Sequence, residues 1–86
     1  MTRIEYERAG RRLKMSGHAG AGEYGADTVC AALSILLYAL IDAGAAGTLS
    51  PGAAELSLPA CDVDVAMRGF RLLAENFPEN VCYKEL

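Results

Sequence analysis

The chain's single histidine and one of its three cysteines lie close together in the stretch GHAGAGEYGADTVCAALS, residues 17–34. A cysteine thiolate is the attacking species in covalent catalysis, and a nearby imidazole can stabilise it and later protonate a leaving amine. The glycine-containing segment between His18 and Cys30 makes contact between the two side chains inexpensive in loop-closure entropy. The pair therefore suggests a nucleophilic cysteine–histidine site.

The position of Cys30 at the start of an apolar run supports this chemistry. The run from Val29 to Ile41 predicts a helix that begins near Asp27 and ends at about Ala43. With Asp27 as the N-cap, Cys30 would lie in the first turn, where free N–H groups and the helix dipole stabilise a thiolate. The same N–H groups could donate to an oxyanion. Asp27 is either this helix cap, the favoured role, or a third residue that orients the imidazole.

Other interpretations of the same residues stay open at this point. His18 can be a turn residue, and Cys30 can be a buried cysteine that packs as a small hydrophobe. A zinc site formed by His18, Cys30, Cys61 and Cys82 is disfavoured, because no C-x-x-C or H-x-x-x-H spacing occurs. The glycines do not form a nucleotide-binding motif either. We therefore expect no metal and no cofactor.

The N-terminal third predicts a hairpin followed by a glycine-rich loop. Residues 3–7 and 11–16 alternate apolar and charged side chains, with Ala9-Gly10 between them, as two half-buried strands do. Residues 17–26 then carry four glycines, too many for a regular element, and are expected to form a mobile loop. These glycines are Gly17, Gly20, Gly22 and Gly25.

The second half predicts one strand, one helix and a final strand. Residues 48–53 read as a connection, and residues 54–58 as a strand that Pro59 ends. Asp62 or Asp64 caps a helix whose apolar residues recur at three- and four-residue steps. The members of this stripe are Val63, Met67, Phe70, Leu73 (or Ala74) and Phe77. With a short strand at 81–84, the order is β-β-α-β-α-β, which predicts an α+β domain with a mostly antiparallel sheet of about four strands and two helices on one face.

Composition limits the classes of function. The 86 residues are enough for a single domain, 1–86, that tends to be marginally stable alone, so a homodimer is expected. The net charge of −3 and the scattered basic residues argue against direct nucleic-acid binding. The thirteen-residue apolar run is too short to span a membrane. With no signal-peptide pattern and an odd number of cysteines, the expected location is the cytoplasm.

The stretch at residues 17–34 resembles the signature of the ribosomal-processing cysteine proteases, the Prp family. The matching residues are Gly17, His18, Ala19, Gly20, Gly25, Asp27, Cys30, Ala31, Ala32 and Ser34. The resemblance implies a small cytoplasmic α+β homodimer that removes a short N-terminal extension from a large-subunit ribosomal protein. It places the nucleophile on Cys30, its partner on His18 and the motif aspartate on Asp27. The chain is shorter than family members around residues 44–55, where relatives have more strand.

The sequence is therefore interpreted as a cysteine endopeptidase. Its partner is the N-terminal extension of a ribosomal protein, bound in an apolar groove near Cys30 and admitted by movement of the glycine-rich loop. The alternative is a non-catalytic dimeric adaptor that binds a ribosomal protein during ribosome assembly without cutting it. Reactivity of the Cys30 thiol distinguishes the two interpretations.

Overall fold

The computed structural model describes residues 1–17, 24–50 and 52–86, with residues 24–27 described by their backbone alone. These residues form five strands and two helices. In chain order they are β1 (Thr2–Glu7), β2 (Arg12–Ser16), α1 (Tyr24–Asp42), β3 (Ala46–Ser50), β4 (Ala53–Ser57), α2 (Asp64–Asn76) and β5 (Val81–Glu85).

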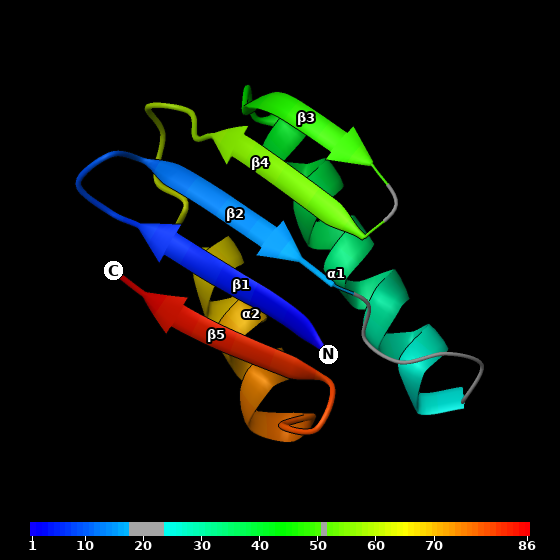
Figure 1. Ribbon diagram of the computed structural model, residues 1–86. Coiled ribbons are helices and arrows are strands. Elements are labelled where there is room, and N and C mark those ends of the chain that lie inside the picture. Colours follow the sequence, from blue (N-terminus) through cyan, green and yellow to red (C-terminus); the bar gives the residue numbers. More distant parts are fainter. Residues whose placement is uncertain (18–23, 51) are drawn as a thin grey trace.

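The strands form one sheet in the order β3-β4-β2-β1-β5. The three pairings β3–β4, β4–β2 and β2–β1 are antiparallel, and β1–β5 is parallel. Both helices lie on the same face of the sheet (Figure 1). The predicted α+β class and mostly antiparallel sheet are confirmed, with five strands in place of about four.

The N-terminal hairpin has the predicted alternation. Ile4, Tyr6, Leu13 and Met15 point into the core, where each is at most 8% exposed. Because side chains alternate between the two faces of a strand, the charged residues between these positions lie on the face away from the helices.

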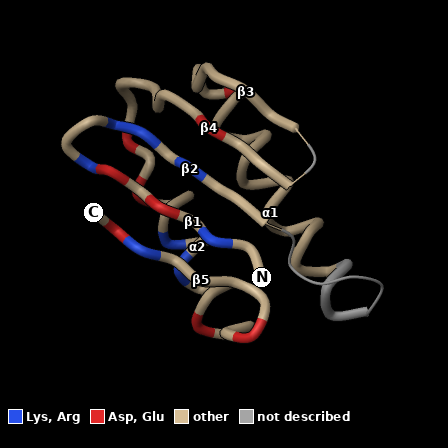
Figure 2. Tube along the Cα trace, in the orientation of Figure 1, with Lys and Arg blue, Asp and Glu red and all other residues tan. Residues whose placement is uncertain are grey.

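The face of the sheet away from the helices carries a row of alternating charges. Register places Glu55 beside Lys14, Lys14 beside Glu5, and Glu5 beside Lys84, so negative and positive side chains alternate across four strands. Figure 2 shows these charges distributed over the strands. Opposite charges on neighbouring strands favour this register, and they keep this face in solvent.

Helix α2 covers the sheet through the predicted stripe. Met67 and Phe70 are buried within it, Val63 is buried just before it, and Leu73, Ala74 and Phe77 pack against the same core. The predicted cap by Asp62 or Asp64 is wrong, because the N-cap of α2 is Val63 and its side chain makes no capping hydrogen bond. The Asp62 carboxylate, one residue before the N-cap, accepts a hydrogen bond from the N–H of Asp64 at 2.8 Å. The core between α2 and the sheet therefore follows the sequence pattern closely.

The prediction of a connection at residues 48–53 is wrong for most of its length. Residues 48–50 belong to β3 and Ala53 begins β4, and the two strands pair from Ala46↔Ser57 to Ser50↔Ala53. All five residues of β3 are exposed, so the strand has no alternation of buried and exposed positions that a sequence pattern could reveal. The strand predicted at 54–58 lies at 53–57, and Leu58 is buried just beyond it.

Helix α1 begins at Tyr24, three residues before the predicted N-cap. Gly25 is therefore helical and does not belong to a loop, and Asp27 is the fourth residue of the helix and not its N-cap. The strongly helix-forming sequence that follows explains this, since adding a turn to an existing helix is cheap and one internal glycine costs only about 1 kcal/mol. Within the described part of the chain, neither helix has the length and apolar character to cross a membrane.

Candidate active site

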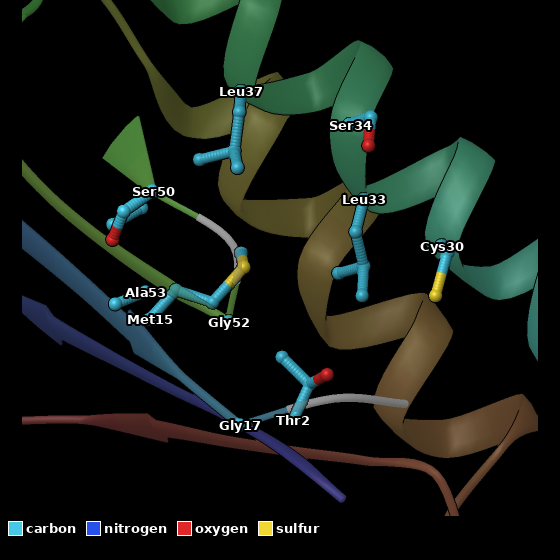
Figure 3. A pocket seen from close by; sticks show the side chains of 11 residues that line it. Thr2, Met15, Gly17, Cys30, Leu33, Ser34, Leu37, Ser50, Gly52 and Ala53 are labelled. Atoms are coloured by element: carbon cyan, nitrogen blue, oxygen red, sulfur yellow. The ribbon is translucent and has the colours of Figure 1, made fainter. Parts of the chain in front are cut away.

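Cys30 lies in a cleft between α1 and the neighbouring end of the sheet (Figure 3). The cleft has a volume of about 240 Å³. Its lining residues are Thr2, Met15, Gly17, Cys30, Leu33, Ser34, Leu37, Ser50, Gly52, Ala53 and Ala54. Most of these side chains are apolar or small, so the cleft suits an uncharged, largely apolar segment of a polypeptide.

The packing of α1 brings the Cys30 thiol to this cleft. Val29 is fully buried and Leu33 is 5% exposed, and these two residues anchor the helix on the core. Cys30 follows Val29 on the helix and is exposed. The alternative of a buried cysteine that serves only packing is therefore wrong.

The other two cysteines lie elsewhere. Cys61 precedes α2, and Cys82 lies on β5 beside Met1 and Lys84, away from the cleft. Both are exposed, as Cys30 is. Among the described residues, no cluster of three or more histidine, cysteine, aspartate or glutamate side chains has the arrangement of a metal site.

Gly17 fixes the chain at the edge of the cleft, one residue before His18. Its φ of +89° is a conformation that glycine adopts readily and other residues avoid. Its N–H donates to the carbonyl oxygen of Gly52 at 2.8 Å. A Cβ at this position would overlap the backbone carbonyl of Met1. Gly17 was expected to provide flexibility, but here it makes a close, hydrogen-bonded contact that directs the chain.

Gly17 and Cys30 line the same cleft. The predicted pairing of Cys30 with His18 is not tested by the structure. His18, Gly20 and Gly22 lie outside the described residues. The side chain of Asp27 is also outside them. The contact between His18 and Cys30, and the orienting role of Asp27, remain predictions.

The early start of α1 changes the expected electrostatics of Cys30. Cys30 is the seventh residue of the helix, so it lies in the second turn. The effect of the helix dipole decays within the first turn, and a backbone N–H in the second turn is already bonded to the carbonyl four residues earlier. The amide of Cys30 is thus not a free oxyanion donor, and the predicted effect of the helix N-terminus on this thiol is weakened.

The cleft contains three hydroxyl groups that the sequence reasoning did not assign to the site. They belong to Thr2, Ser34 and Ser50. For Ser34 a signal exists, because residues four apart share one face of a helix and Ser34 follows Cys30 at that spacing. No such signal exists for Thr2 and Ser50, which reach the cleft only through the sheet.

Comparisons with known proteins identify the family and the fold. A protein-family model described as "Cysteine protease Prp" matches residues 1–81. No curated protein matches the chain. Among solved structures, SMU.848 from Streptococcus mutans is 26% identical with a TM-score of 0.76, over 99% of this chain and 91% of that one.

Two further structures show the essential ribosomal processing protease Prp from S. aureus, one with a covalently linked product peptide and one with a substrate peptide. They are 20% and 19% identical to this chain, with TM-scores of 0.77 and 0.75, and both alignments cover all of each chain. At this identity they show that the fold is shared.

Proposed function

The chain belongs to the Prp family of cysteine proteases, and we propose that it removes a short N-terminal extension from a large-subunit ribosomal protein. In this proposal residues 1–86 act as one catalytic domain in the cytoplasm, with Cys30 as the nucleophile and His18 as its acid–base partner. The observation that carries it is the exposed thiol of Cys30 in an apolar cleft, at the edge of which Gly17 directs the chain toward His18.

The proposed reaction needs only protein groups and water. The Cys30 thiolate attacks the scissile carbonyl carbon, and the imidazolium of His18 gives its proton to the leaving amine as the C–N bond breaks. This leaves a thioester between Cys30 and the N-terminal fragment. The imidazole then takes a proton from water, whose oxygen attacks the thioester carbonyl; the C–S bond breaks, which releases the carboxylic acid and restores the Cys30 thiolate beside the imidazolium.

Side-chain hydroxyls in the cleft are our candidates for stabilising the oxyanion. The Cys30 amide is engaged within the helix, so donors must come from other groups near the sulfur. Ser34 lies one turn further along the same helix face, and Thr2 lies across the cleft on β1 (Figure 3). A donor of this kind contributes about 2.7–4 kcal/mol in a well-formed oxyanion hole.

The surface between α1 and α2 supports a homodimer. An apolar groove of about 390 Å³ runs between the helices. Small residues, Ala32 and Gly69, lie in it beside Ile35 and Leu72, which are 63% and 54% exposed. The same surface thus offers both a groove and protruding aliphatic side chains, as a two-fold interface between identical copies requires. We propose that a second copy covers it.

The test of function uses the ribosomal protein from the same organism, purified with its N-terminal extension. Mass spectrometry after incubation should show loss of an N-terminal peptide with the wild-type protein, and no loss with Cys30→Ser or His18→Ala. The matched control is Cys82→Ser, which changes an exposed thiol outside the cleft and should leave cleavage intact. Binding without cleavage by the wild-type protein would instead support the adaptor.

Alkylation separates activation of the thiol from its accessibility. Cys30, Cys61 and Cys82 are all exposed, so differences in their rates of reaction with iodoacetamide at pH 7 reflect chemical activation. Cys30 should react fastest, and His18→Ala should slow Cys30 alone. Equal rates at all three positions would contradict a cysteine–histidine pair.

A further inference from the structure

Strand β3 is an edge of the sheet that lacks the usual protection. It is the outermost strand next to β4, and among the described residues nothing pairs with its outer side. Its sequence, AGTLS, contains no charge and no proline, and every residue in it is exposed. Exposed edges of this kind are normally blocked, because their free N–H and C=O groups pair with other chains.

The opposite edge shows the contrast. Strand β5 carries Lys84 and Glu85, and Glu85 is held by Arg8 at 3.2 Å. Charged side chains of this type discourage pairing with another strand. The β5 edge of the sheet thus carries charges that oppose strand pairing, whereas the β3 edge carries none.

Register indicates which backbone groups of β3 face outward. The pair Ser50↔Ala53 closes the hairpin between β3 and β4. In a two-residue hairpin the closing pair is hydrogen-bonded, and hydrogen-bonded pairs then alternate along the ladder. Thr48 therefore bonds to β4, whereas the N–H and C=O groups of Leu49 point to the outer edge.

The open edge leads directly to Cys30. Ser50 is the last residue of β3, and together with Gly52 and Ala53 it lines the cleft opposite α1 (Figure 3). Cys30 faces the same cleft from the helix. An extended peptide that pairs with β3 would therefore reach the nucleophile as it passes the end of the strand.

We propose that the substrate polypeptide binds by adding a strand to the outer edge of β3 and then enters the cleft at Cys30. This inference rests on the proposed protease function and specifies how the substrate is held. Main-chain hydrogen bonds to β3 supply affinity for any extended segment, and the apolar cleft selects among side chains. The lack of charge along β3 is then a requirement of substrate binding.

The test measures binding of a synthetic peptide to the Cys30→Ala protein, which cannot cleave it. The peptide carries the N-terminal extension of the same organism's large-subunit ribosomal protein. Leu49→Pro removes one outward N–H, and because one net hydrogen bond corresponds to a change of about fivefold to tenfold in affinity, Kd should rise by that factor. Leu49→Ala keeps the N–H, so Kd should stay within about twofold of the parent.

Amide hydrogen exchange provides a measurement that needs no variant of β3. Saturating peptide should slow exchange at the Leu49 amide by at least about tenfold, because a hydrogen-bonded amide exchanges only on opening. Unchanged exchange at Leu49 with peptide bound would overturn the inference. Slow exchange that depends on protein concentration without peptide would also overturn it, because a second copy would then occupy the edge.

The outcomes distinguish this inference from the proposed function. Cleavage of the peptide by the wild-type protein without protection of Leu49 would refute strand addition and leave the protease assignment intact. Failure of the wild-type protein to cleave or bind the peptide would refute both strand addition at β3 and the proposed function.

Discussion

The close contact between Gly17 and the N-terminal segment predicts that one methyl group added at Gly17 lowers the stability of the fold strongly. We expect Gly17→Ala to lower the free energy of unfolding by about 2–5 kcal/mol. A residue other than glycine in a left-handed conformation costs about 1–2 kcal/mol, and Gly17 has φ of +89°. Overlap of the new Cβ with the Met1 carbonyl requires a backbone shift, for which overpacking costs of about 1–3 kcal/mol are typical.

Thermal unfolding followed by circular dichroism, with urea unfolding in parallel, measures this effect. In a domain of this size 1 kcal/mol shifts Tm by about 4–8 °C, so Gly17→Ala should lower Tm by at least about 8 °C. Activity should fall as well, because the residue directs the chain into His18.

Substitutions at two other glycines separate the cost of the left-handed conformation from the cost of steric overlap. Gly44 has φ of +116°, but a Cβ there would meet only Pro59 at an ordinary 3.5 Å, so Gly44→Ala should show the conformational cost alone. At Gly10 a Cβ would meet only the flexible side chain of Glu7, so Gly10→Ala should have little effect. A Gly17→Ala protein as stable as Gly10→Ala would refute the close contact on which this reasoning depends.

Three further predictions concern the core, the helix surface and pH. Phe70→Ala should cost about 3–5 kcal/mol in urea unfolding because Phe70 is fully buried, whereas Val65→Ala, at 83% exposure on the same helix, should be nearly neutral. Ile35→Glu should convert a dimer to a monomer in sedimentation velocity, and Leu86→Glu, at an exposed position outside the groove, should not; a dimer that survives Ile35→Glu would rule out the groove as the interface. Partial burial, with Glu85 nearby, raises the pKa of Tyr83. The protonated phenol therefore contributes stability that is complete below pH 10 and is lost as the pH rises through the folded-state pKa. Tyr83→Phe should reduce this alkaline loss of stability in unfolding curves.

Sequence patterns predicted those parts of the molecule that are half-buried. The alternation of Ile4 and Tyr6 with charged residues, and the stripe through Met67 and Phe70, reflect a boundary between core and solvent, and the structure has that boundary where the pattern places it. Strand β3 has no such boundary, because all five of its residues are exposed, so no sequence pattern distinguishes its residues 48–50 from a connection.

The arrangement of the sheet and of the cleft depends on contacts between distant segments. The parallel pairing of β1 with β5 joins Thr2 to Val81, and no local pattern encodes it. The sequence pointed to Cys30 through its position near a helix start, yet α1 begins a turn earlier than Asp27 suggested. The hydroxyl groups of Thr2 and Ser50 enter the cleft only because four strands are in register. The sequence could point to Cys30 as the candidate nucleophile, but not to the residues from distant strands that line the cleft beside it.

The pairing of β1 with β5 has a consequence for when the enzyme becomes competent. Thr2 lines the cleft, and its backbone N–H is held by the carbonyl of Asn80 at 2.8 Å. During synthesis β1 emerges before β5, so this hydrogen bond and the pairing of β1 with β5 form only after the segment around residue 80 has left the ribosome. Peptidase activity should therefore arise late in synthesis and in one step, and nascent chains that stop before β5 should carry Cys30 without an assembled cleft.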